Sequence, residues 1–195
     1  MMCASARAQS GANSTAISSD GAIIGTFTLG YSGISTFESN ADDNVKGKLL
    51  RADMMLLYRD FLFEADVQNI SFDQGNSRFL YTAVGYRIIS EAPMPEVYLL
   101  AGYLSSERFP LEGLVYNKGH NGFGIGGMFR MEVETLLNSE ASFAWTYFPQ
   151  DGVSYKSMHV GWEIKKIGIS IGGVGIRVPD GRFYGGYVFA LRYKW

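Results

Sequence analysis

The residues of this sequence best placed to do chemistry are charged side chains on either side of a short turn. Arg51 and Asp53 precede the turn at Arg59-Asp60, and Glu64 and Asp66 follow it, with each pair two residues apart. Successive side chains of a β-strand point to opposite faces of the sheet, so the two members of each pair share one face. The four side chains are therefore expected together on one face of a hairpin.

A two-residue turn also fixes which residues face each other across the hairpin. The expected register sets Asp53 opposite Asp66, Met55 opposite Glu64 and Arg51 opposite Gln68. Three carboxylates then crowd together and repel one another unless cations such as Arg51, Arg87, Arg130 or Arg192 reach across to them. Such a cluster can form a pore constriction or a polar relay. The favoured interpretation is a salt-bridged plug that stabilises a closed interior.

Two histidines are candidates for acid–base chemistry. His120 follows the longest predicted loop, near Glu107. The favoured interpretation is an ordinary histidine of a surface loop, with no catalytic residue, and a catalytic site at His120 and Glu107 is the less favoured alternative. His159 is expected inside, near Glu163, as a hydrogen-bonding residue. Neither histidine has the paired spacing of a metal site, and a single cysteine excludes a cysteine-based zinc site. The sequence therefore predicts no metal and no cofactor.

The elements that position these residues are runs in which apolar and polar residues alternate, separated by turn signals. Ten runs occur, at 22–33, 46–58, 61–71, 78–89, 96–105, 121–132, 139–148, 154–164, 167–178 and 183–195. The count is even, and each run is close to the ~9–11 residues that a tilted membrane-spanning strand needs. We predict an all-β fold, a transmembrane antiparallel up-and-down β-barrel of about ten strands. Eight strands is the alternative, and twelve is less favoured.

The two faces of these runs differ as a membrane barrel requires. One face gathers aromatic residues near strand ends, where girdles sit at the lipid boundary: Tyr31, Tyr58, Phe61, Tyr86, Trp145, Tyr147, Trp162, Tyr187, Tyr193 and Trp195. The other face carries glycine and charge, and the predicted lumen-lining residues are Arg51, Asp53, Glu64, Asp66, Arg87, Arg130, Glu132, Glu140, His159, Glu163 and Arg192. A soluble ligand-binding barrel reverses these faces and is kept as an alternative.

The carboxy-terminal run is the most specific feature of the chain. Its outward positions are Tyr187, Phe189, Leu191, Tyr193 and Trp195. This strand resembles the closing strand of small bacterial outer-membrane β-barrels, where the pattern is the signal read by the barrel-assembly machinery; an ordinary amphipathic last strand is the alternative. The resemblance covers residues 21–195. It implies the outer membrane of a Gram-negative-type bacterium, with outer-membrane lipids and the assembly machinery as partners, and leaves open an envelope protein partner.

Residues 1–20 are small and polar. They contain Ala4-Ser5-Ala6 and Ala6-Arg7-Ala8, each of the A-x-A form of a signal-peptidase site. We predict a signal-peptide remnant or a flexible periplasmic lead, and an ordinary Ser/Ala-rich tail stays open as the alternative. Residues 21–195 are expected to form a single barrel domain.

The composition of the chain narrows the classes of function that the sequence allows. Charged residues make up 18% of the 195 residues, against roughly 25% in typical domains. The formal charge of -2 argues against a nucleic-acid-binding protein. The sequence predicts a non-enzymatic outer-membrane barrel with a narrow, charge-lined lumen, serving envelope structure, interaction or limited passage of small solutes. Its architecture is similar to that of omptin-type proteases and lipid A deacylases, which implies a rim hydrolase as the first alternative, although no local motif of either family surrounds His120.

Overall fold

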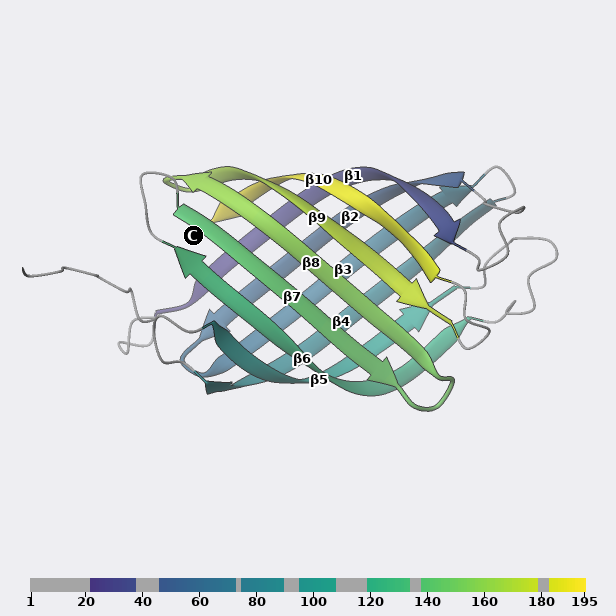
Figure 1. Cartoon of the computed structure of the whole chain (residues 1–195), viewed down its shortest axis with the longest axis horizontal. Helices are drawn as coiled ribbons and strands as arrows, with labels where there is room; N and C mark the ends of the chain where they lie inside the picture. Colours follow the sequence, from purple (N-terminus) through teal and green to yellow (C-terminus); the bar gives the residue numbers. More distant parts are fainter. Residues whose placement is uncertain are drawn as a thin grey trace, which may run out of the picture.

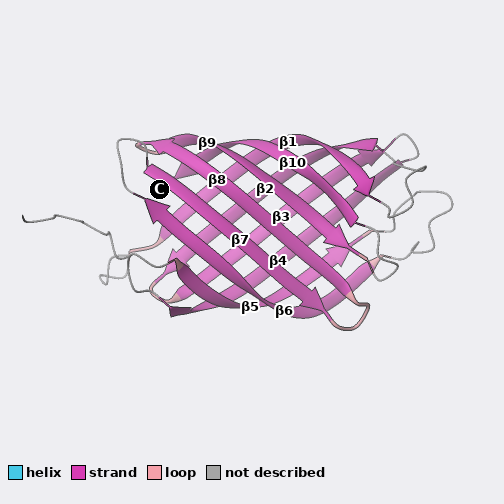
Figure 2. Cartoon of the chain, viewed as in Figure 1, coloured by secondary structure: helices cyan, strands magenta, loops and turns pink. Residues whose placement is uncertain are grey.

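The computed structural model of the chain describes residues 22–37, 46–72, 75–89, 95–107, 119–133, 138–178 and 183–195. Every regular element among them is a β-strand (Figure 2). The strands are β1 (Ile24–Phe37), β2 (Lys46–Tyr58), β3 (Phe61–Phe72), β4 (Gly75–Ile89), β5 (Glu96–Ser106), β6 (His120–Val133), β7 (Asn138–Phe148), β8 (Val153–Ile164), β9 (Ile167–Arg177) and β10 (Phe183–Lys194). No helix of the described residues is long and apolar enough to cross a membrane. The predicted lead at 1–20 lies outside the described residues.

Each strand pairs antiparallel with its neighbours in sequence, and β1 closes the sheet by pairing with β10. The first and last strands meet from Thr26 opposite Lys194 to Phe37 opposite Phe183. Closure leaves no sheet edge with unsatisfied backbone groups. The chain is a closed ten-stranded antiparallel β-barrel (Figure 1). The predicted fold class is confirmed, and the eight-stranded alternative is wrong.

The two ends of the barrel differ in how their strands are joined. At one end, here called the turn end, two-residue turns at 59–60 and 165–166 join β2 to β3 and β8 to β9. Arg59 and Lys165 open these turns with φ values of 54° and 61°, a left-handed conformation that reverses the chain tightly. The other end, here called the loop end, carries the connections at 38–45 and 107–119. The predicted long loops, 34–45 and 106–120, fall largely outside the described residues.

The outer wall of the barrel is apolar. The ten aromatic residues predicted to face outward are 36–70% exposed. Between them lie aliphatic side chains such as Ile125 and Leu191, which are 70% and 67% exposed. Strand β5, which is apolar on both faces, directs Leu99 outward and Tyr98 and Leu100 inward. Away from the loop end, the wall therefore presents a hydrophobic surface to its surroundings.

The interior is packed with side chains, and much of it is apolar. The loop-end core fills the loop-end half and consists of Leu49, Ile70, Phe79, Tyr81, Ala83, Leu104, Phe148, Val153, Tyr155, Val174, Ile176, Val178, Tyr184 and Val188. The turn-end core consists of Met55, Leu57, Leu62, Tyr98, Leu100, Met128 and Ala144. The sequence predicted an interior that is partly glycine and partly charge, with Met55 among its inward residues. The extent of both cores was missed because apolar residues on both faces of a strand hide the alternation on which the prediction depends.

Candidate functional site

The hairpin of β2 and β3 has the register predicted from its turn. Asp53 lies opposite Asp66, Glu64 lies opposite Met55, and Arg51 lies opposite Gln68. The three carboxylates and Arg51 are all buried, with exposed fractions of 6% or less. We call Arg51, Asp53, Glu64, Asp66 and Gln68 the central acid cluster.

One guanidinium holds this cluster together. Arg51 Nε donates to Asp66 Oδ2 at 2.9 Å, and Arg51 Nη2 lies 3.4 Å from Asp53 Oδ2. Gln68 Nε2 donates a further bond of 2.9 Å to Asp66. Glu64 makes no ion pair with any described residue, and its buried Oε2 has no hydrogen-bond partner there. Two carboxylates therefore share one cation, and the third lies beside them without one.

Of the four arginines considered for this role, Arg51 alone contacts the central acid cluster among the described residues. Arg87, Arg130 and Arg192 bind other carboxylates nearer the turn end. The sequence could not separate these possibilities, because the height of each side chain in the lumen depends on the stagger of the closed sheet.

The cluster continues across the barrel to the opposite wall. Tyr155 of β8 donates a hydrogen bond to Asp66 of β3, and these strands lie five positions apart in the ten-strand order. The Tyr155 ring stacks on Tyr81 with centroids 4.2 Å apart, and the Tyr81 hydroxyl bonds with Thr146 Oγ1 at 2.8 Å. Side chains from opposite walls therefore meet at this level of the lumen.

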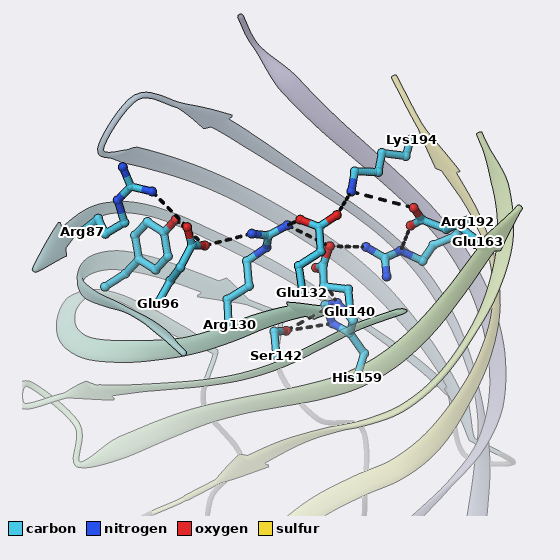
Figure 3. A network of polar contacts seen from close by, with 11 residues as sticks. Arg87, Glu96, Arg130, Glu132, Glu140, Ser142, His159, Glu163, Arg192 and Lys194 are labelled. Atoms are coloured by element: carbon cyan, nitrogen blue, oxygen red, sulfur yellow. Dashed lines mark hydrogen bonds and ion pairs between the residues drawn. The ribbon is translucent and has the colours of Figure 1, made fainter. Parts of the chain in front are cut away.

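A second polar group, the turn-end network, spans β4 to β10 (Figure 3). It contains Arg87, Glu96, Arg130, Glu132, Glu140, Glu163, Arg192 and Lys194. Arg130 lies at its centre and is 2% exposed. Its guanidinium donates to Glu96 at 2.8 Å, to Glu132 at 2.8 Å and to Glu140 at 3.1 Å. A planar guanidinium suits this role because its donors diverge in fixed directions.

Arg192 and Lys194 connect this network to the closing strand. Arg192 Nη2 lies 3.0 Å from Glu140 Oε2, and Arg192 Nε lies 3.1 Å from Glu163 Oε1. These nitrogen atoms are close enough for ion pairing, but they do not reach hydrogen-bond geometry. Lys194 binds Glu132 and lies 3.9 Å from Glu163. The space for Arg192 comes from Gly161, where a Cβ atom would collide with the guanidinium.

Arg87 and His159 occupy the margins of the network. Arg87 bonds the turn residue Asp60 at 2.7 Å and Glu96 at 2.9 Å. His159 faces the interior, where its ring lies 3.1 Å from Ser142 Oγ and 3.5 Å from Glu140. The sequence placed His159 near Glu163, but in the structure its carboxylate neighbour is Glu140.

His120 is the clearest departure from the sequence-based picture. It begins β6 and is 1% exposed, so it is not a surface-loop residue. Its Nδ1 lies 2.6 Å from Asp151 Oδ2, and its backbone N–H donates to Ser106 Oγ at 2.9 Å. The described contacts of Glu107 are instead made by its backbone, whose N–H donates to Arg78 O and whose carbonyl accepts from Ser77 Oγ. No local pattern pointed to Asp151, which lies 31 residues further along the chain.

The His120–Asp151 pair has the arrangement of a histidine oriented by a carboxylate. A base of this kind needs its second nitrogen directed at a nucleophile or at substrate. His120 Nε2 is enclosed and has no hydrogen-bond partner among the described residues. The described part of the chain also holds no group of three or more His, Cys, Asp or Glu side chains suited to a metal ion.

The carboxy-terminal strand directs its predicted assembly residues outward. Tyr187, Phe189, Leu191, Tyr193 and Trp195 are 44–70% exposed. The backbone of Trp195 exchanges hydrogen bonds of 3.0 and 3.1 Å with Gly25. The end of the chain is therefore paired within the closing seam, while its aromatic side chains remain on the outer wall.

Comparisons with known proteins give matches to solved structures. No protein-family model and no curated protein sequence matches the chain. Neisserial surface protein A (NspA) matches with 10% identity and a TM-score of 0.42, over 89% of this chain and 96% of that chain. The outer membrane protease OmpT from Escherichia coli matches with 10% identity and a TM-score of 0.44, over the same shares of 89% and 96%.

A bacterial polysaccharide outer membrane secretin also matches, with 11% identity and a TM-score of 0.39, over 85% of this chain and 69% of that chain. Two of these three proteins are described as outer-membrane proteins. The barrel fold of the present chain follows from its own strand pairing.

Proposed function

We propose that the protein is a non-conducting outer-membrane barrel, a stable envelope element that serves structure or interaction. The observation that carries this proposal is the contact between Asp66 and Tyr155, which joins opposite walls of the barrel. The Tyr81–Tyr155 stack and the two apolar cores support the same conclusion, because they fill the interior above and below that contact. A lumen packed in this way leaves no continuous aqueous path.

The surface of the barrel favours a membrane over water. All seven Asp and Glu residues of the described strands face the interior. Large side chains such as Phe123 and Ile167, which are 71% and 68% exposed, face outward. A soluble barrel with this arrangement would expose a hydrophobic surface far larger than monomeric proteins tolerate. Lipid therefore suits the outer wall better than solvent does.

The polarity of the barrel follows the usual asymmetry of such proteins, with short turns on the periplasmic side and longer loops outside. The turn end, with its turns at 59–60 and 165–166, then faces the periplasm. In this orientation Trp195 lies at the periplasmic boundary, where the barrel-assembly machinery would read the closing strand. The loop end is the part available to an envelope or external partner.

Conductance measurement tests the proposal. Protein inserted into planar lipid bilayers should give no stepwise current, and heat-modifiable migration in detergent gels should show that the same preparation is folded. Regular conductance steps from folded protein would overturn the proposal and favour solute passage. Protein that stays folded and dispersed in water without detergent would overturn the membrane placement.

The hydrolase alternative has one observation in its favour, the pairing of His120 with Asp151 at the loop end. The enclosure of His120 Nε2 counts against it, because a working base must reach its substrate. Assays of the reconstituted protein with peptide and lipid ester substrates would decide between the hydrolase and the structural role. Turnover that disappears in a His120→Ala variant would establish the hydrolase. No turnover by the unmodified protein would support the structural role.

A further inference from the structure

The outer wall near the loop end carries cations that have no evident use within the fold. Among the strand side chains described, the charged ones on this wall are Lys48, Arg78, Lys156 and Arg177. All four lie in the loop-end part of their strands. Within the described residues, Lys156 and Arg177 make neither an ion pair nor a side-chain hydrogen bond. A cation on a lipid-facing wall is costly unless an anion from its surroundings meets it.

Strand register brings Lys156 and Arg177 together. Arg177 of β9 lies opposite Ser154 of β8, and Lys156 lies opposite Gly175, so the two cations are diagonal neighbours on adjacent strands. They line a hollow of about 510 Å³ together with Trp145 and Tyr147. Aromatic side chains of this kind sit at the level of lipid headgroups.

A second hollow begins at Lys156 and extends along the wall toward the middle of the barrel. Its volume is about 360 Å³, and its outer floor includes Gly173, Gly175 and Gly185. Gly175 lies opposite Gly185, and Gly173 lies opposite Tyr187, so the floor crosses the β9–β10 pair. Phe143, Met158 and Tyr187 form apolar walls around it. A Cβ atom at Gly175 or Gly185 would collide with the Phe183 ring, so these two glycines make room for that ring. At Gly173 a Cβ atom would meet nothing closer than 3.7 Å, so the open floor of the groove lies at Gly173.

We propose that these two hollows form one binding site for an anionic phospholipid of the leaflet at the loop end. Lys156 and Arg177 bind the headgroup phosphate, and the glycine-floored groove holds an acyl chain. The cations lie toward the loop end and the apolar groove lies toward the barrel middle, which is the order of headgroup and chain in a leaflet. The site rests on the proposed function, because only an inserted barrel presents this wall to lipid.

Trp145 provides a local probe, since it lies opposite Lys156. In a Trp162→Phe/Trp195→Phe background Trp145 is the remaining tryptophan. The protein is reconstituted into vesicles that contain either brominated phosphatidylcholine or brominated phosphatidylglycerol, and quenching of Trp145 gives the relative affinity of the two lipids. Juxtamembrane cations each contribute on the order of a fivefold preference for anionic lipid, so phosphatidylglycerol should be favoured about tenfold or more.

Three variants test the parts of the site. Lys156→Gln/Arg177→Gln should reduce the preference to about one. The matched variant Lys48→Gln/Arg78→Gln removes the same charge from β2 and β4 and should leave the preference unchanged. Gly173→Leu should weaken quenching by both lipids, because it fills the groove; a Cβ atom there meets nothing closer than 3.7 Å, so the fold tolerates the substitution.

Equal quenching by the two lipids in the parent protein would overturn the lipid site while leaving the membrane barrel intact. An unchanged preference in Lys156→Gln/Arg177→Gln would overturn it as well. Absence of quenching by either lipid from folded protein would mean that Trp145 does not face lipid, which is a failure of the proposed function itself. Heat-modifiable migration of every variant verifies folding before the comparison.

Discussion

Replacement of Arg130 by methionine is the most direct test of the packed interior. The variant keeps a long apolar side chain but removes the guanidinium that bonds Glu96, Glu132 and Glu140. Loss of one partner from a buried ion pair costs about 3–5 kcal/mol, because a charge is left buried without compensation. Each carboxylate here retains a second cation, and Glu96 and Glu132 are 17% and 22% exposed. We therefore expect the lower end, about 3 kcal/mol of unfolding free energy.

The free energy of unfolding is measured by urea titration of the protein in phospholipid vesicles, with tryptophan fluorescence as the signal. Arg130→Lys keeps the charge but cannot reach three carboxylates at once, so it should lose about half as much as Arg130→Met. The matched control is Arg78→Met, which makes the same substitution on the outer wall and should change stability by about 0.5 kcal/mol or less. A loss from Arg130→Met no larger than that of the control would refute the reasoning that the turn-end network stabilises the barrel.

Substitutions at Glu64, Gly161 and Trp195 test three other parts of the barrel. Glu64→Gln should raise the urea midpoint, because it removes the carboxylate that repels Asp53 and Asp66 without a cation of its own; a lower midpoint would mean that the Glu64 charge is compensated. Gly161→Val should destabilise the barrel by about 1–3 kcal/mol through collision with Arg192, whereas Gly33→Ala, whose Cβ meets nothing within 4 Å, should not. Trp195→Ala should reduce the heat-modifiable fraction recovered from outer membranes, and wild-type yield would remove its role as an assembly signal.

The local part of the structure was predictable from the sequence. Alternation at period two predicted the strands and their outward aromatics, and the turn at 59–60 predicted that Asp53 faces Asp66. Both predictions depend on residues within one hairpin, where side-chain direction follows from chain geometry. The orientation of strand β5 was ambiguous, because apolar residues on both of its faces remove the alternation that distinguishes inward from outward side chains.

The candidate site was predictable only in part, because its contacts join distant strands. His120 meets Asp151 and not Glu107, and His159 meets Glu140 and not Glu163. The pairing of Tyr155 with Asp66 joins residues 89 positions apart. No local pattern predicts these pairs. The partner of each side chain depends on the stagger of the strands along the barrel axis, which is set when the sheet closes.

The strands, their two faces and the burial of charge on one face were all predictable from the chain, since they follow from the alternating geometry of an extended backbone. Which side chains meet inside the lumen depends on the closed sheet. Pairing of β1 with β10 fixes the stagger, and the stagger brings Tyr155 level with Asp66 and Tyr81 from the far wall. The interior of a barrel is shared by all of its strands, so its packing is a property of the closed sheet and of no single segment.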